Sequence, residues 1–490
     1  MIYLHDLNEL ENIIDQIEPE EYETIFTEEN TIDFVETALY LMDRYIEDNP
    51  TAISEPDFHD IFIEEIKELF YAQFEEQIYY NEEIEDDIDE VLDETFKIFF
   101  TLFYNERSFE KNFSIENTDS VVYNNLIKQK LDYLRNIPQP PQRTNEWYEF
   151  RHNLITASNA YKAFESQSTI NQLIYEKCQP LNLKNNEEKQ QLVNTNTTFH
   201  WGQKYEPLSV MIYEYLYHTK IEDFGCIQHE KYKFIGASPD GINIDENSKK
   251  YGRMLEIKNI VNREINGVPK KEYWIQMQLQ MEVCDLDECD FLETKFIEYD
   301  NFESFKNDNK ITNFIFDNNE YEKFTQNINN MKGMILYFNT KEAKPFYVYK
   351  PLNIIDENDI IIWEENMIDL YQSEKYSMTF IKIIYWKLEK LSCVLVQRNK
   401  KWFEDNIKQL EKVWKIIEEE RISGYDHRAP NKKNKKEQQK IFIEQNKGCF
   451  LNFQNYSKNI IVQKIDNTDS GNIILDMKIE NNDKDKNNDN

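Results

Sequence analysis

The sequence predicts an α/β core that follows an acidic helical domain and precedes a second helical region. The charge distribution is the first observation. The 490 residues include 92 Asp and Glu against 56 Lys and Arg, for a net charge of −36, and residues 1–100 alone contribute 32 acidic against 3 basic side chains. Residues 138–142, Pro-Gln-Pro-Pro-Gln, are the second, because a helix cannot continue through them. Beyond this break, strand-like and helical patterns alternate to about residue 300, which favours a mixed core.

The first 100 residues are predicted to be helical and not a featureless acidic tail. Aromatics make up 14% of the chain, too many for a disordered protein, so there is material for real cores. Apolar residues recur at helical spacing in three stretches, which predicts three amphipathic helices. We assign residues 1–135 to an acidic helical domain and residues 136–142 to a Pro-rich linker. The three stretches are Phe34, Ala38, Leu41 and Tyr45; Ile61, Ile63, Ile66, Phe70 and Phe74; and Ile88, Val91, Leu92, Phe96 and Phe99.

The remaining chain divides into a core at 143–350, a helical extension at 351–424, and a basic linker with a polar tail at 425–490. Residues 301–350 are rich in Asn and Phe and have no clear pattern. Residues 357–422 are predicted to be helical from the spacing of their apolar side chains. The run Arg428–Lys440 holds six basic residues against one acid, and is either a solvated linker or a contact for phosphates. We expect the last ten residues, 481–490, to be disordered.

Composition also excludes several classes of protein. No apolar run approaches about 18 residues, and no basic region precedes an apolar stretch at the N-terminus, so neither a membrane span nor a secretory signal is predicted. The six Cys include no Cys-x-x-Cys pair, which favours isolated reduced thiols in a cytoplasmic setting. A charge of −36 argues on its face against nucleic acid. However, residues 151–300 hold 17 basic and 23 acidic side chains, so most of that charge lies elsewhere.

The chemically informative block spans residues 199–280. Asp240 lies in the turn Ser-Pro-Asp-Gly, after a strand predicted at 231–235, and Leu-Glu-Ile-Lys-Asn at 255–259 predicts a second strand. Alternate side chains of a strand share a face, so Glu256 and Lys258 point the same way while Leu255 and Ile257 enter the core. If Asp240 and Glu256 converge, their repulsion calls for a cation, and hard oxygen ligands suit Mg²⁺ or Mn²⁺. By itself the triplet is weak evidence, because a surface ion pair produces the same pattern.

Neighbouring motifs strengthen this interpretation. Residues 199–216 predict a helix that carries Glu206 in an early turn. Residues 273–280 predict another helix, on which Tyr273, Gln276 and Gln280 share one face, while Trp274, Met277 and Met281 are better explained as core. Upstream, Trp-Tyr-Glu-Phe-Arg ends at Arg151, and Ile-Thr-Ala-Ser follows at 155–158. Thr156 or Ser158 is expected to cap the next helix, whose N-terminus also suits a phosphate.

In this order, the six motifs resemble the YqaJ-like viral recombinases, relatives of phage λ exonuclease in the PD-(D/E)XK nuclease superfamily. They are Trp-x-x-x-Arg, Ile-Thr-Ala-Ser, Gly-x-x-x-Glu, Ser-Pro-Asp-Gly, Glu-x-Lys and Tyr-x-x-Gln-x-Gln. The resemblance covers about residues 143–300. It implies a restriction-endonuclease-like α/β core, in which a mixed β-sheet is flanked by helices. The acidic domain and the tail have no counterpart in this resemblance.

The resemblance also implies roles at the matching positions. Asp240 and Glu256 would bind Mg²⁺ or Mn²⁺ together with the backbone carbonyl of Ile257, and Glu206 would lie close to a second metal position. Lys258 would position the nucleophilic water, and Gln276 would line the catalytic site with support from Tyr273. Arg151 and Ser158 would hold the terminal phosphate of a DNA end. His200, just before the Gly-x-x-x-Glu motif, is interpreted as a partly exposed residue at a helix start and not as a catalytic group.

The resulting hypothesis is a metal-dependent exonuclease that resects duplex DNA ends for viral-type recombination or replication. One alternative is a nuclease-like scaffold that binds DNA or a partner without cleaving. Another is an acidic interaction protein, in which residues 1–105 engage a basic partner or compete with DNA for the groove. A homo-oligomer and a single-strand annealing partner are implied only by resemblance. A cytoplasmic site, a viral replication site or the host nucleus all fit, whereas secretion and a membrane do not. Cleavage polarity and processivity cannot be read from the sequence.

Overall fold

A computed structural model describes residues 28–80, 83–104, 106–108, 120–140, 144–181, 194–195, 197–308, 313–315 and 331–429. The compact unit Met1–Arg428 contains all of these except Ala429. The basic run, apart from Arg428, and the polar tail therefore lie outside the described residues. Within the described part, no helix combines the length and the apolarity that a membrane crossing requires, and the five cysteines there are buried free thiols.

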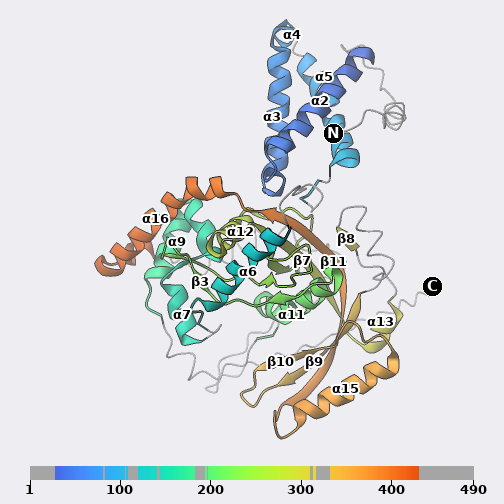
Figure 1. The fold of residues 1–490 in the computed structure, drawn as a ribbon, viewed down its shortest axis with the longest axis vertical. Helices are drawn as coiled ribbons and strands as arrows, with labels where there is room; N and C mark the ends of the chain where they lie inside the picture. Colours follow the sequence, from blue (N-terminus) through green and yellow to red (C-terminus); the bar gives the residue numbers. More distant parts are fainter. Residues whose placement is uncertain are drawn as a thin grey trace, which may run out of the picture. The chain divides into compact units, whose positions relative to one another are not determined.

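The acidic segment is helical, as its apolar periodicity predicts. Its helices are α2 (Glu28–Asp48), α3 (Phe58–Gln73), α4 (Glu75–Tyr80) and α5 (Glu83–Ile98), and a π-helical turn at Phe99–Phe103 follows (Figure 1). The three longer helices pack against one another through a shared apolar cluster. Met42 of α2, Phe62 of α3 and Leu92 of α5 are completely buried in it. Ile61 was expected on the buried stripe but is 40% exposed, because the stripe of α3 runs through Phe58, Phe62, Ile66 and Phe70.

Helix α6 (Ser120–Asn136) packs with the α/β core and not with the acidic helices. Its buried residues Ile127, Leu131 and Leu134 belong to the apolar cluster formed by strands and helices between residues 155 and 417. The packing thus differs from the predicted grouping of residues 1–135 as one acidic helical domain. The charge pattern could not reveal this packing, because α6 follows the acidic stretch directly in sequence. Its apolar stripe would fit a helix of the acidic domain as well as a helix of the α/β core.

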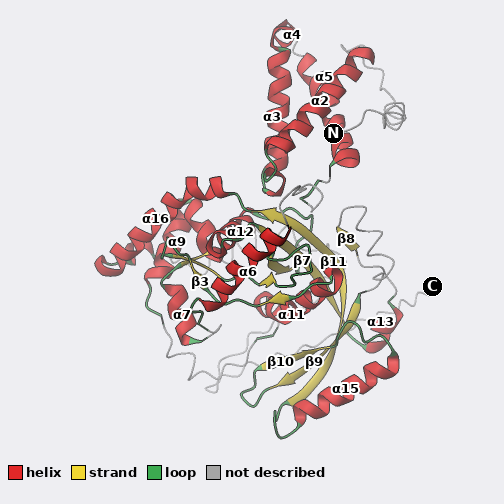
Figure 2. Ribbon diagram, in the orientation of Figure 1, coloured by secondary structure: helices red, strands yellow, loops and turns green. Residues whose placement is uncertain are grey.

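The main sheet of the described residues has eight strands and is mixed, as predicted for the core (Figure 2). Its order is β10-β9-β11-β7-β6-β5-β2, and β8 pairs in parallel with β11. Strands β6 and β7 are parallel, whereas the other neighbours along this path are antiparallel. The bounds are β2 Ile221–Glu222, β5 Gly241–Asn243, β6 Met254–Asn259, β7 Glu288–Tyr299, β8 Asn313–Ile315, β9 Lys332–Asn339, β10 Pro345–Tyr349 and β11 Thr379–Gln397.

Helices cover both faces of strands β6 and β7. On one face, Leu255 and Ile257 pack with α11 (Thr198–Tyr217), as the alternation of the strand predicts. On the other face, Met254 and Phe291 pack in the cluster shared by α6, α9 (Gln167–Cys178), α12 (Lys271–Cys284) and α16 (Lys400–Ser423). Glu256 lies between Leu255 and Ile257 in sequence, so its side chain points to this second face, toward α12.

A small sheet stands beside the main one and carries the chain into the Ser-Pro-Asp-Gly turn. Its order is β1 (Ile155–Thr156), β4 (Ile235–Ala237) and β3 (Ile227–Gln228). The strand predicted at 231–235 is therefore displaced and only Ile235 of that run is extended. A turn occupies the residues before it, closed by a 2.9 Å hydrogen bond from Ile235 N to the carbonyl of Tyr232. Tyr232 and Phe234 instead pack against the core beside α16.

The C-terminal region is not continuously helical, which corrects the prediction for residues 357–422. Helices α15 (Glu357–Gln372) and α16 flank the long strand β11. The run from Phe380 to Trp386 is rich in Ile and aromatic residues, and β11 pairs with both β7 and β9. Residues 301–350, which had no clear pattern, contain α13 (Phe302–Asn307) and strands β8, β9 and β10. The short helices α7 (Asn145–His152) and α8 (Ala157–Ala160) complete the core.

The packing of α6 can be tested with Leu131→Ala. Leu131 is completely buried, so the cavity should lower the free energy of unfolding by about 2–5 kcal/mol. All 7 Trp lie beyond residue 143, so Trp fluorescence during urea unfolding reports on the α/β core alone. Leu126→Ala is the matched control on the same helix, because Leu126 is 48% exposed, and it should cost less than about 0.5 kcal/mol. An unchanged Trp transition in Leu131→Ala would place α6 outside the core.

Candidate active site

Strand register brings the two predicted carboxylates face to face. In the antiparallel pair of β5 and β6, Gly241 lies opposite Leu255 and Ile242 opposite Met254. Continuing this register by one residue places Asp240 opposite Glu256. Because β5 begins only at Gly241, the backbone of β6 beyond Leu255 has no strand partner on this side. The Asp240 carboxylate takes that place, and its Oδ2 accepts a 2.8 Å hydrogen bond from the Ile257 N–H.

Glu256 is a fully buried carboxylate held by three donors. Its Oε1 accepts a 2.7 Å hydrogen bond from Gln276 Nε2, and its Oε2 accepts a 2.8 Å bond from Gln280 Nε2. Lys258 Nζ also contacts Oε1, as their shared strand face predicts. Burying an ionised carboxylate is costly unless it is paired and hydrogen-bonded. The surface ion pair considered as an alternative for this triplet is therefore wrong, since the acid lies in the interior.

Lys258 is positioned by the carboxylates and by an aromatic ring. Its ammonium group lies 4.7 Å from the ring centroid of Tyr273, a cation–π arrangement. Burial lowers the pKa of Lys258, but the charges of Glu256 and Asp240 outweigh burial and raise the pKa above its usual value. Lys258 is thus a cation in the structure, and it supplies the positive charge nearest to the two opposed acids.

The electrostatics of Asp240 reflect the crowding of negative charge. Loss of water around this half-buried carboxyl raises its pKa well above the ordinary range, and the charges of Glu256 and Glu206 add to the effect. The ammonium of Lys258 and the hydrogen bond from the Ile257 N–H act in the opposite direction. Like charges placed directly across a strand pair are destabilising. This point of the sheet is therefore one where a further cation would be stabilising.

Helix α11 brings Glu206 to the same place. The helix starts at the N-cap Thr197, whose side chain accepts a 3.1 Å hydrogen bond from the His200 N–H. A buried polar contact ties the helix to the end of β6, because Ser209 Oγ donates to Asn259 Oδ1 at 2.7 Å. Thr294 of β7 donates to the same oxygen at 2.7 Å. Glu206 itself is exposed on the wall of the cavity described next.

A cavity of about 660 Å³ collects most of the predicted site residues. Its lining includes Asp240, Gln276 and Glu206 together with Arg151 and Ser158. Glu256 and Lys258 are not among the lining residues but contact Gln276, which is, and the ring of Tyr273 in turn contacts Lys258. The structure therefore gathers the whole predicted set. The other lining residues are Gln139, Pro140, Trp147, Thr156, Ala157, Asp223, Phe224, Gly225, Ser238, Pro239 and Gln280.

Arg151 is held in place by contacts on three sides. Its guanidinium lies 4.5 Å from the ring centroid of Trp147 and donates to Ser238 Oγ at 3.3 Å. Lys177 Nζ donates to the Arg151 carbonyl at 2.8 Å. Burial lowers the pKa of Lys177 to about 8, and the positive charges of Arg151 and Arg421 add to this effect. Arg151 therefore gives the cavity lining a fixed cation, which suits a phosphate group.

Two local expectations need correction. Thr156 stands at the N-cap position of α8, but its side chain makes no capping hydrogen bond and instead lies 3.3 Å from Ser158 Oγ. With only four residues, α8 offers little helix dipole, so its N-terminus does not make the capped phosphate site that the sequence predicts. His200 is 5% exposed and not partly exposed, because its Nε2 lies 2.6 Å from Tyr347 Oη on β10. That neighbour is 147 residues away in sequence.

Three contributing residues were not assigned a role from sequence. Gln280 was placed on the correct helix face, and it also donates to the carbonyl of Ser238 at 3.2 Å, while its buried Oε1 has no hydrogen-bond partner. Ser238 was read only as part of a turn, although it is the partner of Arg151. Asn259 continues the alternation of β6, and its polar side chain in an apolar run was the available signal.

The donor set can be compared with the needs of a divalent cation. Within the described residues, no group of three or more His, Cys, Asp and Glu lies close enough to be a metal site. Oxygen donors are nevertheless concentrated here, since the charges of Glu256 and Glu206 both raise the pKa of Asp240. In an extended strand the N–H and C=O of one residue point the same way, so the Ile257 carbonyl also faces the Asp240 side. Hard oxygen ligands around an excess of negative charge fit Mg²⁺ or Mn²⁺.

Comparison with known proteins agrees with the motif analysis. The family model of the YqaJ-like viral recombinase domain matches residues 146–287, which confirms the resemblance for this part of the chain. An uncharacterized protein of Acanthamoeba polyphaga mimivirus is 30% identical over 312 residues, which is 59% of this chain and 54% of that protein. The chain thus spans about half the length of this relative.

Two solved structures are also similar. One is the alkaline exonuclease LHK-Exo from Laribacter hongkongensis, and the other is LHK-Exo in complex with dAMP. Sequence identity is 15% and 16%, the TM-score is 0.30 in both cases, and each match covers 57% of this chain and 94% of the other.

The lowered pKa of Lys177 predicts a pH dependence of stability. Between pH about 8 and 10.5 the unfolded state keeps this proton and the folded state releases it, so the free energy of unfolding should rise with pH in this window. Lys177→Met removes the titrating group and should flatten that rise, measured by denaturant unfolding at several pH values. Lys249→Met, at an exposed lysine, should keep it. Parallel pH profiles for wild type and Lys177→Met would contradict the assignment.

Proposed function

We propose that residues 143–424 form a metal-dependent deoxyribonuclease that degrades duplex DNA from its ends. The observation that carries this proposal is Asp240 lying opposite Glu256, with Lys258 on the same strand face as Glu256 and Arg151 lining the same cavity as Asp240. The family match over residues 146–287 supports it. Resection of DNA ends in viral-type recombination or replication is the biological role that such a domain would serve.

The proposed site binds a cation through Asp240, Glu256 and the Ile257 carbonyl, with Glu206 close to a second position. A bound Mg²⁺ or Mn²⁺ would lower the pKa of a coordinated water and neutralise charge on the phosphate. Lys258, which lies beside Glu256 Oε1, would hold the attacking water by hydrogen bonding. As the water oxygen bonds to phosphorus, the bond from phosphorus to the leaving sugar oxygen breaks. Gln276 keeps the Glu256 carboxylate oriented throughout.

Arg151 in the cavity lining would account for the proposed preference for DNA ends. Arg151 and Ser158 line the cavity together with Asp240, so a terminal phosphate bound there would place the adjoining phosphodiester near the carboxylates. Arg151 is fixed by Trp147 and Ser238, so little side-chain entropy is lost on binding. A single-strand annealing partner and a homo-oligomer belong to the family resemblance, and no contact described above depends on them.

Substitution of the two central residues tests the chemistry. Asp240→Ala and Lys258→Ala should each lower the cleavage rate at least about 100-fold, because each removes a group that acts on the developing charge. The assay is release of label from end-labelled linear DNA with and without Mg²⁺. The control is Lys249→Ala. Lys249 is an exposed lysine in the turn that precedes β6, so this variant should cleave like wild type. Full activity in either site variant would sink the catalytic assignment.

Closed-circular DNA in the same assay separates the alternatives. Cleavage of linear DNA alone identifies an exonuclease, and cleavage of circles identifies an endonuclease. If wild-type protein binds DNA but cleaves neither form with Mg²⁺ or Mn²⁺, a nuclease-like scaffold is the better description.

A further inference from the structure

Helix α12 carries a second polar face, which points away from the cavity. Gln276 and Gln280, one turn apart, face Glu256. Gln278 and Glu282 are also one turn apart and face the turn between β11 and α16. From Trp274 onward the other side chains of the helix are core, so its two polar faces indicate that its position is specified from both sides.

The side chain of Gln278 forms two hydrogen bonds with the backbone of this turn. Its Nε2 donates to the Gln397 carbonyl at 2.9 Å, and its Oε1 accepts from the Asn399 N–H at 2.7 Å. The side chain is 1% exposed, so both hydrogen bonds are shielded from water. The buried amide of Gln278 thus hydrogen-bonds to the backbone on both sides of residue 398. These bonds fix the position of the turn relative to α12.

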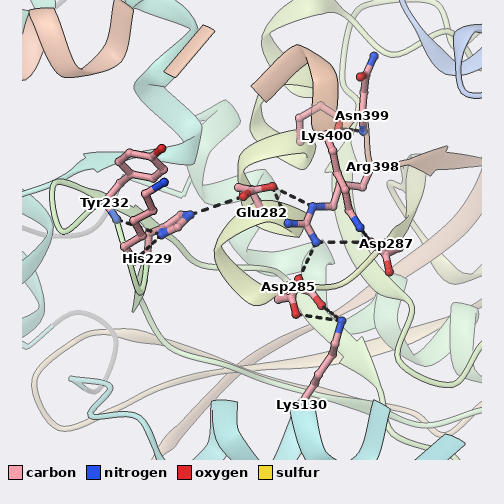
Figure 3. A network of polar contacts seen from close by, with 11 residues as sticks. Lys130, His229, Tyr232, Glu282, Asp285, Asp287, Arg398, Asn399 and Lys400 are labelled. Atoms are coloured by element: carbon pink, nitrogen blue, oxygen red, sulfur yellow. Dashed lines mark hydrogen bonds and ion pairs between the residues drawn. The ribbon is translucent and has the colours of Figure 1, made fainter. Parts of the chain in front are cut away.

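Arg398, at the centre of the turn, clamps the C-terminal end of α12. Its Nε and Nη2 donate to Glu282 Oε2 at 2.9 and 2.6 Å, and its Nη1 donates to Asp285 Oδ1 at 2.8 Å (Figure 3). The arginine side chain is 8% exposed. Asp285 is the C-cap residue of α12 and has a positive φ of 51°. A cation at this end also complements the helix dipole.

Further contacts converge on the same carboxylates (Figure 3). Lys130 of α6 lies 3.0 Å from Asp285 Oδ2. His229 Nδ1 accepts hydrogen bonds from the backbone N–H groups of Lys231 and Tyr232, so a neutral ring carries its proton on Nε2, which lies 3.7 Å from Glu282 Oε1. Burial raises the pKa of Glu282, but His229 and Arg398 outweigh it and hold that pKa below its usual value. Glu282 is therefore an anion that Arg398 can hold.

We propose that Arg398 is a positioning residue of the nuclease site, acting through α12 on the Glu256 carboxylate. The proposal rests on the function proposed above. The clamp fixes the end of the helix on which Gln280 lies, two residues before Glu282, and Gln280 holds Glu256 Oε2. A shift of the helix by a fraction of a turn lengthens both glutamine bonds, and small misplacements of a catalytic group reduce the rate strongly. Arg398 lies outside the matched region 146–287.

The test compares steady-state cleavage of end-labelled linear duplex by the full chain and its variants. Arg398→Gln should lower kcat about 10-fold to 100-fold. KM should change less than about threefold, because the proposed phosphate-binding residue Arg151 is untouched. Arg398→Lys keeps one ion pair but cannot span Glu282 and Asp285. Its kcat should therefore fall between that of wild type and that of Arg398→Gln. If the Gln variant does not fold, the Lys variant carries the test alone.

A double-mutant cycle separates positioning from simple loss of stability. In a Gln280→Ala background, Arg398→Gln should reduce kcat by less than in wild type, because the glutamine nearer to the clamp no longer links α12 to Glu256 and only Gln276 remains. Arg428→Gln is the matched control, since Arg428 makes a comparable two-pronged ion pair with Glu420 at the far end of α16. It should lower thermal stability and leave kcat unchanged.

The outcomes distinguish the two proposals. Wild-type protein that cleaves no DNA overturns the proposed function. Active wild type, together with folded Arg398 variants whose kcat equals that of wild type, overturns only the positioning role. Effects of Arg398→Gln and Gln280→Ala that simply multiply in the double variant also overturn it, because residues acting through one another do not behave independently.

Discussion

The buried carboxylate of Glu256 is the constraint on which the core depends. A charge with no exposure must receive hydrogen bonds from within the protein, and here they come from Lys258 on its own strand and from Gln276 and Gln280 on α12. Strand β6 and helix α12 therefore have to lie in one relative position. The same position places Asp240 across from Glu256 and creates the local excess of negative charge that the proposed chemistry uses.

The two faces of β6 position different parts of the site. Leu255 and Ile257 bury α11 against the sheet, and that helix presents Glu206 at the cavity. Asn259, at the end of the strand, links α11 to β7 through Ser209 and Thr294. On the opposite face, polar side chains engage α12. One six-residue strand thus orients two helices and both central carboxylates.

Charge is organised by region and not by the average over the chain. Residues 1–100 account for −29 of the net −36, whereas the cavity lining includes Arg151, whose carbonyl accepts a hydrogen bond from Lys177. The acidic helices bury their own aromatic cluster. A strongly acidic chain is compatible with a cavity that is proposed to bind phosphate, because Coulomb interactions at a site depend on nearby groups that are poorly screened by water.

The amino-acid sequence by itself determined the local elements and their chemistry. Period-two alternation in β6 and the i, i+3, i+7 spacing of Tyr273, Gln276 and Gln280 depend only on backbone geometry, so these predictions needed no knowledge of distant residues. Only the tertiary structure decided the long-range pairings. Strand β11 was read as helix because its apolar residues fit either period until β7 and β9 pair with it. His200 is buried by Tyr347, α6 packs with the core, and Arg398 meets α12 from more than 100 residues away, since sequence periodicity carries no information about which surfaces will meet.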